Sequence, residues 1–309
     1  MGIKMPEAYF ATTRQIITVK QAQRMGLKTL SGRISCAEKD CSARLRFVDT
    51  YVKGEERETP VAAHFSLISS ITSPHSEDCR YNLDAQVRIA AREAPNLLYS
   101  LRNGTHEFRL HVLSDVLQNK MVPNDASGSA PNANDSRPTS VEYQTQGSLS
   151  AYLSTANRIA VLAARVEDNE DLARRIKLRF RDEAIPWTDF YFDEENFLRC
   201  FRYVRQRSYQ PICVTGEIKA IEEPNGTRKF KTIRLKPPRR DNTSDLLDIP
   251  IVHLNFDPEL MYLASNLSVG DRVVVYGHAL ASAKTKGKIT FQNITVWIRA
   301  RGQIGVVSR

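Results

Sequence analysis

The sequence of 309 residues contains no long hydrophobic run. No stretch approaches the ~18 consecutive apolar residues that a membrane-spanning helix needs. The N-terminal MGIKMPEAYFATTRQ also lacks the continuous apolar stretch of a signal peptide. We therefore expect a cytoplasmic protein without a membrane partner.

The signatures of several enzyme classes are missing as well. The sequence has no Walker A loop, no glycine-rich dinucleotide fingerprint and no Gly-x-Ser-x-Gly elbow. The segment HEFRLHVL does not match the zinc-protease helix, because His106 and His111 are five residues apart rather than four. These absences favour a binding protein over an enzyme.

Cysteine is scarce, and its five residues are an odd number. In a chain without an export signal, this argues against a disulfide framework and for reduced thiols, for which metal binding is the commoner use. Three of the five cysteines and two of the six histidines lie between residues 36 and 79. They are Cys36, Cys41, His64, His75 and Cys79.

This crowding predicts a tetrahedral Zn²⁺ site formed by Cys36, Cys41, His75 and Cys79. The segment CAEKDC predicts a turn that points two thiolates at one place. His75 and Cys79 are four residues apart, one turn of a helix within PHSEDC. Four protein ligands would make the metal structural, because catalytic zinc keeps an open position for water. His64 either replaces one of the four ligands or is a core residue with a satisfied ring nitrogen.

A cysteine pair followed by His-x-x-x-Cys resembles a CCHC-type zinc finger in its general form. The resemblance implies a small N-terminal module that a structural Zn²⁺ stabilises. Strands are expected in SARLRFV and PVAAHFSLI, and a helix in NLDAQVRIAARE behind them. The alternative is a set of buried free thiols and surface histidines, which would leave the polar loops AEKD and SPHSED without an anchor.

The formal charge of +9 is unevenly distributed. Residues 1–118 contain 16 basic residues (Lys and Arg) and 13 acidic residues (Asp and Glu). Residues 119–210 contain 13 of each, and residues 211–309 contain 15 basic and 9 acidic residues. A local basic excess attracts polyphosphate by releasing condensed counterions. The C-terminal excess therefore fits nucleic-acid binding, although solubility alone would also explain it.

Residues 119–148 are rich in Asn, Ser, Pro and Gly and nearly free of large aliphatics. Such a segment cannot bury enough surface to offset its ordering entropy, so we predict a flexible linker. The expected fold class is α+β with several domains. These are a zinc-binding domain (residues 1–118), the linker, a helical middle segment (149–208) and a β-rich domain (209–309).

The middle segment has apolar residues at helical spacing in two runs, residues 149–166 and 172–180. An extended aromatic stretch, IPWTDFYFD, comes next. Asp193 is then expected to cap a helix over EENFLRCFRYVRQR.

Residues 211–301 alternate between strand-like runs and turns. The runs ICVTGEIKAIEE, RKFKTIRLK and IPIVHLNF precede a short helix, DPELMYLAS, and two further strands lie in LSVGDRVVVYGHALAS and KITFQNITVWIRA. This β-β-β-α-β-β order resembles the OB-fold, a five-stranded Greek-key barrel. The resemblance implies that an open face and its loops bind single-stranded nucleic acid.

Strand alternation assigns residues to the faces of this barrel. In the second strand, Ile233 suits the interior, so Phe230 and Thr232 would point outward, with Phe230 stacking on bases. Phe291 and Trp297 share a parity on the last strand, and we expect that side to face the core. The residues expected to bind nucleic acid are Arg228, Lys229, Phe230, Lys231, Arg234, Lys236, Arg239, Arg240, Lys284, Lys286 and Lys288.

A metal-dependent nuclease of the PD-(D/E)xK type is one alternative. Glu217 and Lys219 point to one side of a strand, and Asp189 or Asp193 lies upstream. There the carboxylates would hold Mg²⁺ and the lysine would stabilise charge at the scissile phosphate.

A protein adaptor is the other alternative. An exposed set of Trp187, Phe190 and Tyr191 would dock a partner protein, whereas a buried set would be ordinary core. The function we expect is non-catalytic binding of nucleic acid, with single-stranded DNA favoured over RNA, supported by a structural Zn²⁺.

Overall fold

The computed structural model describes residues 3–53, 59–95, 97–101, 105–110, 146–166, 169–207, 210–226, 228–238 and 247–308. The linker predicted over residues 119–148 lies outside the described residues, except for the start of α5 (Gln146–Arg165). Within these ranges, no helix combines the length and the apolar character that crossing a membrane requires. The chain forms two compact units, Met1–Arg92 with Leu162–Ile176, and Glu93–Val161 with Lys177–Arg309.

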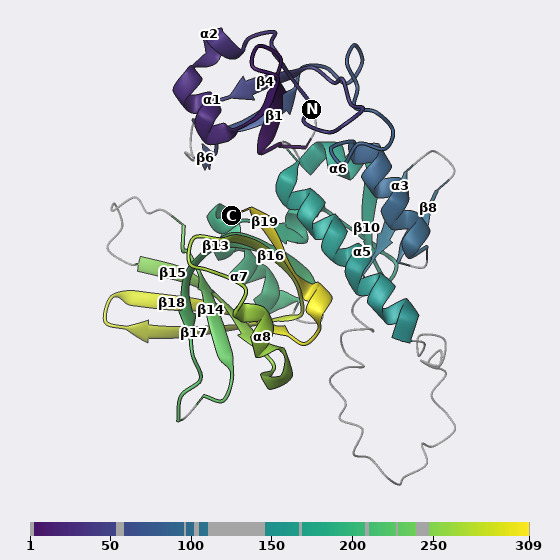
Figure 1. Ribbon diagram of the computed structural model, residues 1–309. Helices are drawn as coiled ribbons and strands as arrows, with labels where there is room; N and C mark the ends of the chain where they lie inside the picture. The colour runs from purple at the N-terminus through teal and green to yellow at the C-terminus, as the bar shows by residue number, and fades with distance from the viewer. Residues whose placement is uncertain are drawn as a thin grey trace. The chain divides into compact units, whose positions relative to one another are not determined.

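The first unit is a small α+β fold (Figure 1). Its strands are β1 (Glu7–Phe10), β2 (Gln15–Thr18), β3 (Ile34–Ser35), β4 (Leu45–Val48), β5 (Tyr51–Lys53), β6 (Thr59–Val61) and β7 (His64–Leu67). Its helices are α1 (Val19–Met25), α2 (Leu27–Leu30), α3 (Leu83–Glu93) and α6 (Asn169–Arg175). Strands β4 and β7 and helix α3 lie where the sequence predicted them.

Strand β1 lies between β2 and β3, and a bridge between Ser35 and Arg44 brings β4 beside β3. Strand β4 pairs in turn with β7, where Phe47 lies opposite Phe65. Alternate residues of β1 and β4 are buried, and all four residues of β7 are buried. The sheet therefore has one face in the core and one face open to solvent.

A later stretch of chain completes the core of the first unit. Ile3 forms a bridge with Val166, and both side chains are buried. Arg175 on α6 forms an ion pair with Asp84 on α3. The two stretches that build this unit are separated along the chain by the 69 residues from 93 to 161.

A four-stranded sheet follows, in the order β11-β10-β9-β8. Its strands are β8 (Leu98–Ser100), β9 (His106–Arg109), β10 (Ile176–Phe180) and β11 (Glu183–Ile185). The prediction that residues 172–180 form a helix is therefore wrong beyond Arg175. Ile176 and Phe180 fit a helix by their spacing, but the buried Leu178 between them completes the alternation of a strand.

The aromatic stretch contains the 3₁₀ turns η2 (Trp187–Asp189) and η3 (Glu194–Asn196), with β12 (Tyr191–Phe192) between them. Trp187 and Phe190 are exposed by only 7% and 1%. These rings are core, so they do not form the exposed docking surface that the adaptor alternative requires. The helix predicted after Asp193 is present as η3 and α7 (Phe197–Gln206), but the predicted cap is not, because the Asp193 side chain accepts no capping hydrogen bond from a backbone N–H of η3.

The order predicted for residues 211–301 is present up to the helix, but three strands follow it instead of two, because the predicted fourth strand is divided into β16 and β17 at His278. The elements are β13 (Ile212–Glu222), β14 (Lys231–Leu235), β15 (Leu247–Phe256), η4 (Pro258–Leu260), α8 (Met261–Ala264), β16 (Arg272–Gly277), β17 (Ala279–Lys286), β18 (Ile289–Ile298), η5 (Arg301–Gln303) and β19 (Ile304–Ser308).

These strands form one sheet in the order β17-β18-β15-β14-β13-β16-β19, and β12 also pairs with β13. Hydrogen bonds do not close this ladder on itself. Its inner face packs around α7, whose Phe197, Phe201 and Val204 join strand residues such as Ile218 and Val296 in one core (Figure 1). Full burial of each such side chain contributes roughly 1.5–3 kcal/mol.

Candidate metal centre and nucleic-acid interface

Four side chains with metal-ligand chemistry converge in the first unit. Sγ of Cys36 lies 3.7 Å from Sγ of Cys79, and Nδ1 of His75 lies 3.3 Å from Sγ of Cys41 and 3.4 Å from Sγ of Cys79. All four ligand atoms lie within 4.8 Å of one another, and all four residues are buried. This Cys/His cluster is the set that the sequence predicted, and it could bind a metal ion.

Two loops carry the ligands. In the first, CAEKDC, the N–H of Cys41 donates to the carbonyl of Glu38 at 3.2 Å, in the predicted turn. In the second, the N–H of Cys79 donates to the carbonyl of Ser76 at 3.1 Å. The helix predicted across His75 and Cys79 does not form. A tight turn brings the two side chains together as well as a helical turn would.

The cluster stabilises a thiolate at Cys79. A hydrogen bond with Cys36, helped by His75, lowers the pKa of Cys79 to about 4, and the same contact raises the pKa of Cys36. Burial opposes ionisation of Cys41, but backbone hydrogen bonds outweigh it and lower its pKa. Burial also opposes protonation of His75, and its contacts with the two sulfurs raise its pKa nonetheless. The thiolate is the form that binds metal.

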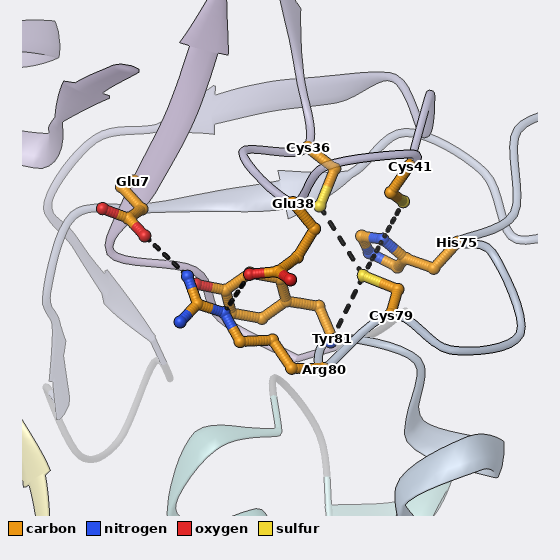
Figure 2. Close-up of polar contacts among 8 residues, drawn as sticks. All are labelled: Glu7, Cys36, Glu38, Cys41, His75, Cys79, Arg80 and Tyr81. Atoms are coloured by element: carbon orange, nitrogen blue, oxygen red, sulfur yellow. Dashed lines mark hydrogen bonds and ion pairs between the residues drawn. The ribbon is translucent and has the colours of Figure 1, made fainter.

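Arg80 connects the two loops (Figure 2). Its guanidinium pairs with Glu7 on β1 and with Glu38 in the first loop, each at 2.6 Å. Its Cζ lies 4.9 Å from the ring centroid of Tyr81, whose N–H points at Sγ of Cys79 at 3.5 Å. No pattern in the sequence singles out Arg80, because arginine is common in this chain.

His64 does not join the cluster. It is 6% exposed on β7, and its Nδ1 lies 2.9 Å from the carbonyl of Ala62, so it is the core residue of the two alternatives. Nε2 of His75 is buried without a hydrogen-bond partner among the described residues. Three thiolates and one imidazole form a donor set that suits tetrahedral Zn²⁺.

The outer face of the large sheet is partly accessible along β18. Ile294, Val296 and Ile298 are fully buried, and Phe291 and Trp297 alternate with them on the half-buried outer side. The expectation that Phe291 and Trp297 face the core is therefore wrong. Large hydrophobic residues occupy both parities of this strand, so alternation alone could not assign its faces.

Phe230 and Trp297 form a ring pair on this outer face. Their centroids are 4.8 Å apart and their planes are inclined by 62°. Both rings are half-buried, and Cζ of Arg299 lies 5.9 Å from the Trp297 ring. Phe230 is thus one half of an aromatic pair rather than the isolated stacking residue that the sequence indicated.

Polar residues continue the outer face between β15 and β18. Nε2 of His253 lies 3.2 Å from Oδ1 of Asn293, and burial lowers the pKa of His253. Thr232, which the sequence placed on the outside, is 3% exposed and donates to Oδ1 of Asn255 at 2.9 Å. A hydroxyl satisfied in this way can be buried on a face that is otherwise accessible.

Several predicted cations of the β14 region pair with carboxylates. Arg228 and Arg234 both pair with Glu222, each at 2.6 Å. The remaining pairs are Lys231 with Glu223 and Lys236 with Glu217. The hydrogen bond from Arg228, together with the charge of Arg234, lowers the pKa of Glu222. A phosphate would have to displace these carboxylates.

Other predicted cations are exposed. Lys284, Lys286 and Lys288 lie at the β17–β18 hairpin, and Lys229 lies just before β14. None of these four has an ion-pair partner within the described ranges. The two predicted binding residues outside the described ranges are Arg239 and Arg240.

The residues of the nuclease alternative are not assembled into a metal site. The register of β13 with β14 shifts between Ile218 and Ala220, so alternation does not place Glu217 and Lys219 on one side, and Glu217 pairs with Lys236 just after β14. Asp189 pairs with Arg199 at 2.5 Å. In the part of the chain that the structure describes, the Cys/His cluster is the one group that could hold a metal ion, and it includes neither Glu217 nor Asp189 nor Asp193.

No family model and no curated protein matches the sequence at a significant level. Among solved structures, the small single-stranded DNA-binding protein from Streptomyces coelicolor is 21% identical, with a TM-score of 0.23, over 31% of this chain and 92% of that chain. The Plasmodium falciparum SSB complex with ssDNA is 18% identical, with a TM-score of 0.21, over 32% of this chain and 93% of that chain. The S. pombe Stn1-Ten1 complex is 16% identical, with a TM-score of 0.19, over 31% of this chain and 57% of that chain. Likenesses of this size decide neither the fold nor the function.

Proposed function

We propose that the protein binds single-stranded nucleic acid, with DNA favoured over RNA, through the outer face of β14, β15, β17 and β18. The observation that carries this proposal is the half-buried pair of Phe230 and Trp297, with the guanidinium of Arg299 beside it. Rings held in place at a surface stack on bases of any sequence, and stacking contributes about 1–3 kcal/mol per base. The exposed lysines of the β17–β18 hairpin would attract the phosphates.

The proposal includes an OB-like barrel. Strand β16 pairs with β13, β17 pairs with β18, and only His278 separates β16 from β17 along the chain. Taken as one bent strand, β16 and β17 would link the two ends of the ladder and make a five-stranded barrel. In such barrels, the face and loops around the ring pair take up oligonucleotides.

The proposal also places Zn²⁺ in the Cys/His cluster. Four protein ligands fill a tetrahedral coordination sphere and leave no position for water. The metal would therefore stabilise the first unit and take no part in a reaction. The non-catalytic assignment is supported by this closed ligand set, which does not include Glu217.

A salt titration of the affinity of the full chain for a fluorescent single-stranded oligonucleotide tests the proposal. Phe230→Ala and Trp297→Ala should each weaken binding by about 1–3 kcal/mol, roughly 5–150-fold, because a stacking surface is lost. The matched control is Tyr262→Ala, which removes a 53% exposed ring on α8, outside the strands of the proposed face. It should bind like the wild type.

Unchanged affinity of both ring variants, or an equal loss in Tyr262→Ala, would contradict the proposal. The same titration with Mg²⁺ present, followed by a gel of product length, tests the nuclease alternative. We expect an intact oligonucleotide. A shortened product that disappears in Glu217→Gln would favour the nuclease instead.

A further inference from the structure

The first unit has a basic surface that the proposed function does not use. Residues 1–53 contain ten Lys and Arg and only four Asp and Glu. Three of these cations, Arg33, Arg44 and Arg46, are exposed on neighbouring strands, next to the first loop of the Cys/His cluster.

The strand register brings the three arginines together. The N–H of Ala11, just after β1, donates to the carbonyl of Arg33 at 2.9 Å, and Ser35 forms a bridge with Arg44. Arg33 lies two residues before Ser35, and Arg46, on β4, lies two residues after Arg44. The residues that alternate with them are buried, so the three arginines share the open face of the sheet.

An aromatic residue lies in the same row. Strand β1 pairs Tyr9 with Ser35 on one side and with Ile16 on the other, and Tyr9 is partly accessible. A hollow of about 480 Å³ lies against Tyr9 and Ser35, and the cysteine loop over residues 36–42, with the exposed Lys39, lines the rest of it. The open face thus combines a ring with cations, and the hollow beside the ring is lined by Lys39 together with Glu38 and Asp40.

The arginines of this face are not neutralised. Within the described ranges, no carboxylate forms an ion pair with Arg33, Arg44 or Arg46. Arg228 and Arg234 of the second unit, in contrast, share Glu222. A guanidinium without a carboxylate partner keeps its donors available for phosphate oxygens, which it binds in a bidentate manner.

We propose that Tyr9, Arg33, Arg44 and Arg46, here named the arginine face, form a second nucleic-acid contact. The arginines hold the phosphodiester backbone, and the ring of Tyr9 packs against a base or sugar at the hollow. This contact is separate from the Phe230–Trp297 pair, and it does not depend on the function proposed for that pair.

The test is the salt dependence of the affinity of the full, metal-loaded chain for a single-stranded and for a duplex oligonucleotide. Each lost phosphate contact lowers the slope of log affinity against log salt by about 0.7 for a single strand and about 0.9 for a duplex. The triple variant Arg33→Gln/Arg44→Gln/Arg46→Gln should therefore lose about 2 units of slope on the single strand or about 3 on the duplex. A loss on only one of the two oligonucleotides identifies the form that contacts this face.

The matched control is Lys20→Gln/Arg24→Gln/Lys28→Gln, which removes the same charge from exposed positions on α1 and α2. It should keep the wild-type slope. Equal losses in the two triple variants would overturn the proposal, because net charge would then explain both. An unchanged slope in the arginine variant would overturn it as well. If that variant loses its metal, the single variants replace it, each with a loss of about 0.7 to 0.9.

Two further variants separate this inference from the proposed function. Tyr9→Ala should weaken binding about fivefold or more, as expected for a lost stacking contact, and Tyr9→Phe should not. Trp297→Ala removes a ring without a charge, so the arginine variant should lower the slope by the same amount in that background. If the arginine variant lowers the slope and Trp297→Ala leaves the affinity unchanged, the arginine face is supported and the ring pair is contradicted. If Trp297→Ala weakens binding and the arginine variant keeps the slope, the ring pair is supported and the arginine face is contradicted.

Discussion

At the scale of the single residue, Arg80 restrains a metal ligand without being one. It follows Cys79 directly, and its guanidinium is held by Glu7 and Glu38, each at 2.6 Å. Charge-assisted bonds of this kind fix a planar guanidinium in orientation as well as position. Glu38 lies between Cys36 and Cys41 in sequence, so Arg80 connects the two loops that carry the ligands.

Arg80→Ala should therefore lower the affinity for Zn²⁺ by about 10–100-fold, the usual cost of losing a group that orients a ligand. Competition with a chromophoric chelator measures the affinity. The control is Arg88→Ala, because Arg88 is exposed on α3 and forms no ion pair with a described residue. Equal affinities of the two variants would contradict the positioning role of Arg80.

Residue type explains why the ligands were predictable and Arg80 was not. Cys and His are rare in this chain, so the crowding of Cys36, Cys41, His75 and Cys79 was a signal in itself. Arg and Glu are common, and nothing in the sequence shows which arginine will meet Glu7, 73 residues away. The arginine face was missed for the same reason, because only the bridge between Ser35 and Arg44 brings the segments of Arg33 and Arg46 together.

At the scale of the element, β13 and β14 form an antiparallel pair whose outer charges neutralise one another. Glu222 on β13 accepts a hydrogen bond from Arg228 and forms an ion pair with Arg234, and its pKa is lowered mainly by the bond from Arg228. Carboxylate and phosphate compete for the same guanidinium donors. Glu222 therefore opposes nucleic-acid binding on this edge of the sheet.

Glu222→Gln should raise the affinity for a single-stranded oligonucleotide, because it releases two arginines. It should also lower stability at pH 7, by less than about 1 kcal/mol, because the groups are partly exposed. Because the pKa of Glu222 is lower in the folded than in the unfolded chain, its ionised form stabilises the folded protein at pH values above the unfolded pKa. This stabilisation is lost as the pH falls through the folded pKa. The difference in Tm between variant and wild type should thus shrink below about pH 4.

Glu259→Gln is the control for this prediction. Glu259 is exposed on η4, forms no ion pair with a described residue, and gives the same change in net charge. If it raises the affinity as much as Glu222→Gln does, the effect comes from net charge and not from the released arginines.

Elements with a single dominant pattern were predicted correctly, and elements with two compatible patterns were not. Helices α3 and α7 each carry one apolar stripe at helical spacing. In β10, the spacing of Ile176 and Phe180 fits helix and strand alike. In β18, both faces carry large apolar residues, so alternation alone does not show whether the face with Trp297 or the face with Val296 packs in the core.

At the scale of the whole molecule, the Cys/His cluster belongs to the first unit alone. Metal analysis should find about one Zn²⁺ per chain, and removing it should cost much of the stability of that unit. Hydrogen exchange after chelation should lose protection in residues 3–92 and 162–176, while β13 to β18 stay protected. A metal-free chain with full protection in the first unit would contradict the zinc assignment.

Cys79→Ser should reproduce the effect of chelation, because it removes one ligand. Cys200→Ala provides the control, since Cys200 is buried on α7 in the second unit. The Cys200→Ala variant should keep its bound metal. The division of the chain into domains around residues 119–148 stays a prediction, because residues 119–145 lie outside the described ranges.

The discontinuous first unit also imposes a sequence of events during synthesis. Its N-terminal stretch leaves the ribosome before Val166, the partner of Ile3, has been made. At about 5–20 residues per second, the 84 residues from 93 to 176 take about 4–17 s to add. All four ligands of the Cys/His cluster precede that interval. A metal ion bound early would stabilise the fold of the nascent N-terminal segment until α6 is synthesised and completes the core of the first unit.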